Sequence, residues 1–337
     1  MSTAARIRVL IVALVALAVL AVAYTVYAAS RTDVRDEPRP GGPVVREGGL
    51  TLDAPGRLLF RNMAWGPLRD RLASVPLGAS RGVRTAGGPT CYTFHAAGGT
   101  GVCVQADRGL VNRFSVVIVD SRLRELRRYP AGGGPSRTRV SPSGRMAAWT
   151  VFVSGDSYAG TNFSTRTSIL DSRTWTLHES LEDYTVIKDG RRYRSVDVNF
   201  WGVTFADDDL FYATMATRGK TYLVRGSVSS RTVWTLTDNA ECPSVSPDGT
   251  RVAFKHRVQG DASSLPWRLH VLDLRTMKET ATAETRPLDT QVAWLDGDTL
   301  LYEVPAEYEA DLWEVPADGS GSPALVMRAA TNPAVLR

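Results

Sequence analysis

The sequence predicts an all-β protein: a six-bladed β-propeller closed by a C-terminal strand and preceded by one N-terminal transmembrane or signal helix. Three observations support this prediction. An uncharged apolar run follows two arginines near the N-terminus. From residue 50 onward, short runs of β-branched and aromatic residues alternate with Gly, Pro, Asp and Ser, a pattern typical of strands and turns. Within that region, one strand–turn–strand pattern recurs six times.

The N-terminal segment indicates export. Arg6 and Arg8 precede Val9–Ser30, which contains no charged residue. A helix of this length crosses a hydrocarbon layer of about 30 Å, and the two arginines favour a cytoplasmic N-terminus. We expect residues 1–29 to be an uncleaved signal anchor or a signal peptide cleaved after Ala28. The first gives a single-pass membrane protein with an extracytoplasmic C-terminal domain, the second a secreted one.

Residues 30–49 are rich in Pro, Gly and charge and poor in apolar residues. This composition predicts a flexible linker. Residues 50–337 then form the propeller domain.

The best copies of the repeat contain Ser246-Pro247-Asp248-Gly249 and Ser141-Pro142-Ser143-Gly144, each between two strand-like runs. Pro presets φ, Asp or Ser hydrogen-bonds within the turn, and Gly accepts a positive φ. Second strands end at Phe60, Val104, Trp149, Tyr212, Phe254 and Tyr302. These residues are 44, 45, 63, 42 and 48 positions apart, near the length of a four-stranded propeller blade. The longest interval predicts an insertion of about 18 residues relative to that blade length.

The first unit lacks a first strand of its own, and residues 332–336 form an extra strand after the sixth unit. An open sheet edge is a liability that a ring of blades avoids. We therefore expect the C-terminal strand to complete the first blade.

The repeat around Ser246–Phe254 resembles that of the TolB-like, WD40-like six-bladed β-propellers. An export segment followed by such a domain is similar to TolB-like proteins of the actinobacterial envelope. The resemblance covers about residues 50–337 and implies the fold. The matched positions are turn and core positions, so the resemblance implies no functional residue.

Composition excludes several classes of function. The formal net charge is only +5, and the arginines are scattered, so nucleic-acid binding is not expected. The four histidines show no metal-ligand spacing, and no Cys-x-x-Cys occurs. The acidic turns at 207–209 and 296–298 are interpreted as solvated β-turns. We therefore expect no catalytic residue, metal site or cofactor. Cys91 and Cys103 flank a predicted hairpin, so an oxidising compartment allows a disulfide between them, the alternative being two small buried residues.

The long loops offer candidate binding residues. In a propeller, the loop after the second strand and the loop into the next blade share one face, and the loops at 154–164, 182–199, 258–267 and 305–310 belong there. Aromatic residues and Arg are enriched at interfaces. The candidates are Tyr158, Phe163, Tyr184, Arg191, Arg192, Tyr193, Arg194 and Trp267. The alternative is that the aromatic side chains hold these loops against the disc while the arginines are solvated.

The function that we expect is a non-catalytic, monomeric binding module that docks an envelope protein or a cell-wall component. Two alternatives use the central channel: a small-ligand sensor and a lactonase-like hydrolase. The channel-lining regions are expected around Thr93, Val140, Val203, Ser244 and Val292, where the sequence is mostly apolar or hydroxylic.

Overall fold

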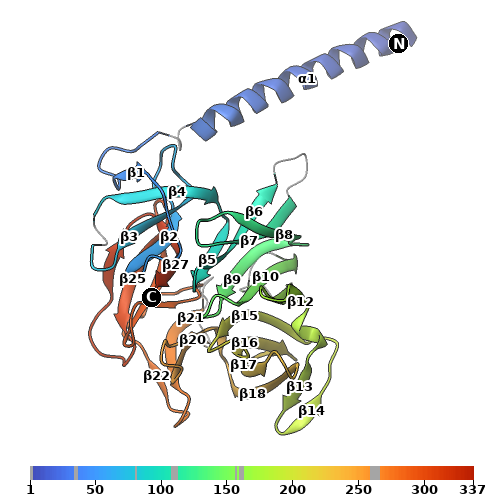
Figure 1. Ribbon diagram of the computed structural model, residues 1–337. Coiled ribbons are helices and arrows are strands. Elements are labelled where there is room, and N and C mark those ends of the chain that lie inside the picture. Colours follow the sequence, from blue (N-terminus) through green and yellow to red (C-terminus); the bar gives the residue numbers. More distant parts are fainter. Residues whose placement is uncertain are drawn as a thin grey trace.

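The computed structural model describes residues 3–33, 37–79, 82–107, 113–155, 158, 163–258 and 266–337. It confirms the predicted fold class. Six sheets surround a central channel, and the inner strand of each sheet contacts the inner strands of its neighbours (Figure 1). One long helix, α1 (Thr3–Asp33), projects away from the ring.

The strands of each blade follow one another from the channel outward. Blade 1 contains β27 (Ala330–Leu336), β2 (Arg57–Asn62), β3 (Arg71–Pro76), β4 (Arg84–Thr90) and β1 (Val45–Glu47). Blade 2 contains β5 (Thr93–Ala97), β6 (Thr100–Asp107), β7 (Arg113–Val119) and β8 (Glu125–Pro130). Blade 3 contains β9 (Gly134–Val140), β10 (Met146–Ser154), β11 (Ser164–Asp171) and β12 (Thr176–His178).

The second half of the ring follows the same plan. Blade 4 contains β15 (Asn199–Phe205), β16 (Leu210–Thr217), β17 (Lys220–Ser227), β18 (Thr232–Asp238), β13 (Thr185–Lys188) and β14 (Arg191–Tyr193). Blade 5 contains β19 (Glu241–Val245), β20 (Arg251–Arg257), β21 (Trp267–Asp273) and β22 (Glu279–Ala281). Blade 6 contains β23 (Ala293–Trp294), β24 (Thr299–Ala306), β25 (Glu309–Pro316) and β26 (Ala324–Met327).

The C-terminal strand closes the ring as expected. β27 pairs antiparallel with β2, with Leu58 opposite Val335 and Leu59 opposite Ala334. Ala334 is fully buried. The first and last parts of the propeller are therefore held in one sheet, which leaves no open edge between blades 1 and 6.

The repeated turn has the hydrogen bonds that its residues predict. In blade 5, the amide of Gly249 donates to Ser246 O at 2.9 Å, and the amide of Thr250 donates to Asp248 Oδ1 at 3.1 Å. Gly249 adopts a φ of 71°. In blade 3, Gly144 has a φ of 83° and donates to Ser141 O at 2.9 Å. These turns reverse the chain between the first and second strands at one end of the channel.

The expected 18-residue insertion lies in blade 4. It forms a short 3₁₀ helix, η1 (Leu181–Asp183), and the hairpin β13–β14, which precede β15 in the chain. β13 pairs parallel with β18, so the hairpin extends the outer edge of the blade. Val186 and Tyr184 are buried against this sheet, which explains why the insertion folds onto the blade.

The segment expected to be a linker contains regular structure. α1 continues to Asp33, and β1 adds to blade 1 by pairing parallel with β4. Arg39 also pairs with Glu307, and its guanidinium lies 5.5 Å from the ring centroid of Trp65. Low apolar content in this segment suggested an unstructured tether, but backbone pairing to a sheet edge does not need apolar side chains.

Cys91 and Cys103 form a disulfide, with a Cα–Cα distance of 5.3 Å. Cys103 lies on β6 opposite Phe94, and Cys91 lies just before β5. The bridge joins the chain entering blade 2 to its second strand. Cys242 is a buried free thiol at the start of blade 5.

Candidate functional site

The lining of the central channel includes the expected apolar and hydroxylic residues, but it also carries charged side chains that the sequence analysis did not predict. It holds two cavities. The loop-side cavity, of about 200 Å³, lies near the loops between blades and is lined by residues that include Arg137, Gln291 and Glu303. The turn-side cavity, of about 190 Å³, lies near the repeated turns and is lined by residues that include Pro142, Pro247 and Arg337. His95 and Arg139 line both cavities and therefore mark the waist between them.

β9 supplies two of the arginines that line the channel. Arg137 and Arg139 are two positions apart, so their side chains leave the same face of the inner strand of blade 3. This spacing within a predicted inner strand is the sequence signal that would have located them. The composition does not identify Arg137 and Arg139 as channel residues, because the sequence does not reveal which face of a strand meets the channel.

A buried ion network borders the loop-side cavity. Asp289 Oδ1 lies 2.5 Å from Lys255 Nζ and 3.2 Å from Arg137 Nη2. Lys255 is 1% exposed. Burial alone would lower the pKa of Lys255, but Asp289 and the other acidic neighbours raise it above its ordinary value. Burial likewise opposes ionisation of Asp289, yet Lys255 and Arg137 hold its pKa below its ordinary value. Both partners are therefore charged at neutral pH.

Three of the candidate binding residues form an aromatic cluster beside this network. Tyr158 stacks on Trp201 with ring centroids 5.3 Å apart, and Phe163 meets Trp201 edge-on at 5.2 Å. Trp267 belongs to the same cluster, and its Nε1 donates to Glu241 Oε1 at 2.9 Å. Tyr158 and Trp267 are buried, whereas Phe163 is half-buried. The two buried rings therefore belong to the packed interior beside the channel network.

The other five candidates lie elsewhere, on or next to the hairpin at the outer edge of blade 4. Tyr184 is buried, and its hydroxyl lies 2.8 Å from His178 Nδ1. The hydroxyl of Tyr193 lies 2.9 Å from Thr217 Oγ1. The exposed candidates are Arg191, Arg192 and Arg194. The structure thus splits the predicted surface into an inner and an outer group. Positions 156–157, 159–162 and 259–265 of the predicted long loops lie outside the described residues.

A groove of about 800 Å³ links these two groups. Tyr158, Phe163 and Trp201 line one part of it, and Thr217, which contacts Tyr193, lines another. Its remaining walls come from blades 4 and 5 and carry charges of both signs. The charged residues that line it are Asp197, Arg218, Lys220, Asp238, Glu241, Arg257 and Glu279.

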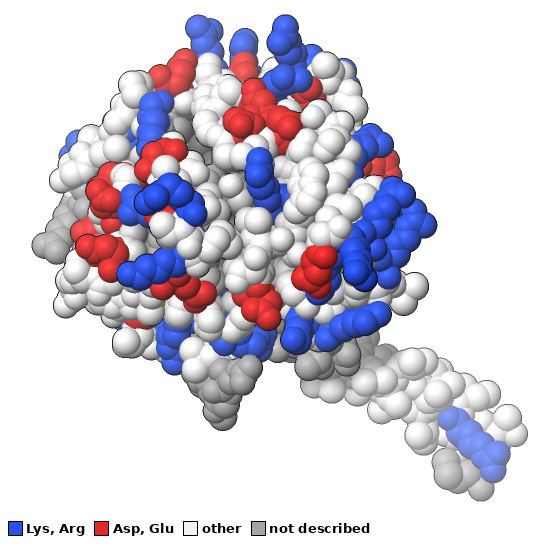
Figure 2. All heavy atoms as spheres, turned by 90° about the horizontal axis from the view of Figure 1, so that it is seen from below, with Lys and Arg blue, Asp and Glu red and all other residues white. Residues whose placement is uncertain are grey.

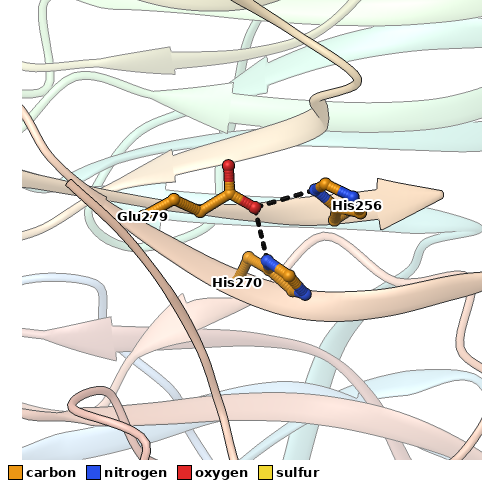
Figure 3. Close-up of side chains that lie close together, drawn as sticks. All are labelled: His256, His270 and Glu279. Carbon is orange, nitrogen blue, oxygen red and sulfur yellow. Dashed lines mark hydrogen bonds and ion pairs between the residues drawn. The ribbon is translucent and has the colours of Figure 1, made fainter. Parts of the chain in front are cut away.

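His256, His270 and Glu279 form a cluster on β20, β21 and β22, at the wall of this groove (Figure 3). The two imidazole rings stack with centroids 4.3 Å apart. Glu279 Oε1 accepts a hydrogen bond from His270 Nδ1 and lies 2.8 Å from His256 Nδ1. The histidines are 14 positions apart, so their proximity depends on the pairing of β20 with β21. Sequence spacing alone gave no sign of it.

The hydrogen bonds around this cluster test whether it suits a metal ion. The side chain of Asn239 is fixed because Oδ1 accepts from the amide of Arg257 and Nδ2 donates to the carbonyl of Arg257. Nδ2 also lies 2.9 Å from His256 Nε2, which must then accept. The proton of the neutral ring is consequently on Nδ1, the atom that faces Glu279. A histidine that binds a metal ion normally donates its other ring N–H to an acceptor. In this structure Nε2 of His256 accepts instead, so the arrangement favours a cluster joined by hydrogen bonds over a metal site.

The carboxylates of the two acidic turns accept hydrogen bonds from backbone amides of the same turns. Asp207 Oδ1 accepts from the amides of Asp209 and Leu210, and Asp296 Oδ1 accepts from the amides of Asp298 and Thr299. These carboxylates serve as turn residues, in agreement with the sequence interpretation.

No protein-family model matches the chain, and no curated protein does. Among solved structures, the chain is similar to TolB from Acinetobacter baumannii, with a TM-score of 0.58 and 16% identity over 84% of this chain and 67% of that one. The fold is that of a TolB-like propeller. Putative TolB from Agrobacterium tumefaciens gives a TM-score of 0.43 at 9% identity, covering 83% of this chain and 91% of that chain.

Other propellers also resemble the chain. A puromycin-hydrolysing peptidase of Mycobacterium tuberculosis has a TM-score of 0.44 at 16% identity, over 77% of this chain and 42% of that one. At 16% identity the likeness to TolB from Acinetobacter baumannii shows the fold alone, and the function has to be argued from this chain's own residues.

Proposed function

We propose that the protein is an exported, membrane-tethered binding module that docks an envelope protein or a cell-wall component in the groove between blades 4 and 5. The observation that carries this proposal is the groove itself. At about 800 Å³ it has the volume of a ligand or peptide site, and it combines apolar and charged walls. Its aromatic end is rigid because Tyr158 and Trp201 are packed, whereas Arg218 and Lys220 at its other end are exposed.

Tethering is supported by α1. The 25 residues Thr3–Tyr27 form a helix long and apolar enough to cross a membrane, and none of its most apolar stretch is buried against the propeller. Four residue steps separate Asp33 from Glu37, a reach of about 14 Å. From Arg39 onward the chain contacts loops of blades 1 and 6. An uncleaved anchor would therefore hold the propeller close to the membrane.

Two measurements test the tether. Mass spectrometry of the mature protein should find the N-terminal segment intact, and the protein should stay in the membrane pellet after an alkaline carbonate wash. A mature chain that begins at Ala29 and is released from the cell would contradict tethering while leaving export intact.

The mixture of positive and negative side chains on the surface suits a protein or cell-wall partner. Figure 2 shows one side of the molecule, on which Lys and Arg side chains are interspersed with Asp and Glu side chains. This side does not display one extended basic field of the kind that nucleic acid requires. A protein or peptidoglycan partner, which presents both charges and neutral polar groups, fits such a surface better.

Photo-crosslinking in living cells tests the docking groove. A photo-reactive residue replaces Lys220, which is exposed at the groove, and in a matched control it replaces Lys278, which is exposed in the turn before β22. We expect one dominant envelope protein or wall fragment to be captured at Lys220 only. Equal capture at both positions, or none at Lys220, would contradict docking in the groove.

The hydrolase alternative receives no support from the channel carboxylates. A lactonase-like site needs carboxylates that are free to hold a metal ion. Asp289 instead pairs with Lys255 and Arg137, and Glu303 accepts from the amide of Asn332 at 2.7 Å. The small-ligand sensor alternative does receive support, because the waist of the channel carries a positively charged side chain that has no ion pair with a carboxylate of the described residues.

A further inference from the structure

Arg139 is a buried arginine without an anionic partner. Its side chain lies at the waist of the channel, and the residue is 8% exposed. Nη2 donates to the backbone carbonyl of Val292 at 2.9 Å, whereas Nε is buried and has no hydrogen-bond partner. Within the described part of the chain, no carboxylate forms an ion pair with it. A buried charge normally has a counter-charge, because removing it from water is costly.

The surroundings of Arg139 add positive charge. Burial, together with the charge of Arg137, lowers the pKa of Arg139 to about 10. It remains protonated at neutral pH. Arg337 lines the turn-side cavity, and Arg137 lines the loop-side cavity. Arg137 shares the carboxylate of Asp289 with Lys255, and Arg337 donates to the carbonyl of Trp294.

His95 supplies a neutral donor at the same place. The amide of Val140 donates to His95 Nδ1 at 3.1 Å. The neutral ring therefore carries its proton on Nε2. Burial, with the charges of Arg139 and Arg337, holds the pKa of His95 well below its ordinary value, so this ring is neutral.

Further donors in the loop-side cavity are unsatisfied. The buried hydroxyls of Thr93 and Thr331 have no hydrogen-bond partner, and neither does Nε of Arg137. All three residues line the cavity together with Arg139. Buried polar groups without partners are uncommon and indicate an ion, water or ligand that satisfies them.

The carboxylates that line this cavity are Glu303 and Glu309. Glu309 pairs with Arg61 and Arg69. Burial raises the pKa of Glu303 above its ordinary value, against the hydrogen bond from Asn332. Neither carboxylate neutralises Arg139, so the waist keeps its positive charge.

We propose that the waist of the channel binds a small soluble oxyanion, a carboxylate or a phosphate, whose oxygens pair with the Arg139 guanidinium and accept from Thr93, Thr331 and His95. An oxyanion supplies the missing counter-charge, and its several acceptor atoms match several unsatisfied donors at once. The cavity is smaller than a typical drug-sized pocket, which limits the ligand to a compact anion. This site is separate from the docking groove, so either proposal can fail alone.

Thermal unfolding and calorimetric titration test the site, with inorganic phosphate and succinate as probes and chloride keeping the ionic strength constant. We expect the unfolding midpoint of the full-length protein to rise with the concentration of at least one probe, because a ligand that binds the folded state stabilises it. The probe that acts distinguishes phosphate from carboxylate. Absence of any shift with both probes would overturn the proposal.

Substitutions test whether the probes bind at the waist of the channel. Arg139→Gln should weaken binding roughly 10- to 100-fold, the loss expected for one charge-assisted hydrogen bond. Arg275→Gln, which changes an exposed arginine in a turn of blade 5, is the matched control and should bind like the wild type. Equal binding by the Arg139 and Arg275 variants would overturn the site.

Two readouts remain if Arg139→Gln does not fold. Thr331→Val removes one hydroxyl and should weaken binding several-fold. The arginine Nε–H resonance of Arg139 should shift during a titration of the wild type and saturate with the calorimetric affinity. A titration that leaves this resonance unmoved would also overturn the proposal.

Discussion

Leu59 lies opposite Ala334, and this pair joins the first complete strand of the propeller to the last strand of the chain. Both residues are fully buried. The contact closes a ring whose other neighbouring blades follow one another directly along the chain. Stability of the whole propeller should therefore depend on β27 more than its seven residues suggest.

Ala334→Asp tests the closure. A carboxylate at this buried position has no counter-charge, and we expect a loss of about 3–5 kcal/mol in the free energy of unfolding. Urea unfolding followed by tryptophan fluorescence gives the value. Ala324→Asp, at an exposed position of β26, is the control and should change stability by less than about 0.5 kcal/mol. Similar effects of both changes would contradict the closure.

Asp289→Asn tests the buried ion network. The substitution leaves the 1%-exposed Lys255 without its anion, and we expect a loss of about 3–5 kcal/mol. Adding Lys255→Met should restore part of that stability, because the orphaned charge is then removed. Chemical unfolding of both variants measures the two effects. No recovery in the double variant would argue against a direct pairing of these side chains.

His95 should contribute to the pH dependence of the free energy of unfolding. Unfolded histidine gains a proton as the pH falls through about 6.5, whereas folded His95 stays neutral because its pKa is held well below that value. The unfolded state then binds more protons, so stability falls as the pH drops below 6.5. His95→Gln should reduce this slope by up to about 1.4 kcal/mol per pH unit. Urea unfolding from pH 7.5 to 5 measures the slope, and an unchanged slope would refute the assignment.

Tyr184 and Arg192 play different structural roles, because one side chain is buried and the other is exposed. Tyr184→Ala should cost about 3–5 kcal/mol, because a buried aromatic side chain is lost. Arg192→Ala should change stability by less than about 0.5 kcal/mol, since this side chain is exposed. Thermal unfolding of each variant distinguishes the two roles. A large loss in the Arg192 variant would show that the hairpin depends on that arginine for folding.

The disulfide should add stability to blade 2. Its loop is short, since the two cysteines are 12 positions apart, and replacing both with alanine should cost about 2–3 kcal/mol. Intact-mass analysis with and without reductant establishes whether the bond is present in the protein isolated from cells. A free-thiol count of three under non-reducing conditions would refute it.

Local patterns predicted the fold well because its elements depend on local chemistry. The turn at Ser246–Gly249 needs only the residues within it, and the same hydrogen bonds recur at Ser141–Gly144. The insertion before blade 4 was visible as a long interval between repeats. Its parallel pairing with β18 was not, because the residues that meet, such as Val186 and Val233, are distant in the chain.

The candidate site was predicted less well. Residue type suggested Tyr158, Tyr184 and Trp267 as interface residues, whereas the structure buries all three side chains. The channel charges were missed because Arg137 and Arg139 become significant only once β9 is the inner strand. Likewise, His256 and His270 meet only through the register of β20 and β21.

The sequence by itself determined an apolar N-terminal helix, six repeated units and their closure by the C-terminal strand. Each of these follows from periodicity, turn chemistry or the need to cover a sheet edge. Tertiary structure decided which of the described loop side chains are exposed, that His256 and His270 stack, and that the buried Arg139 forms no ion pair with a carboxylate of the described residues. Those properties depend on the register of strands within a blade and on contacts between blades, which bring together residues that are remote in the chain.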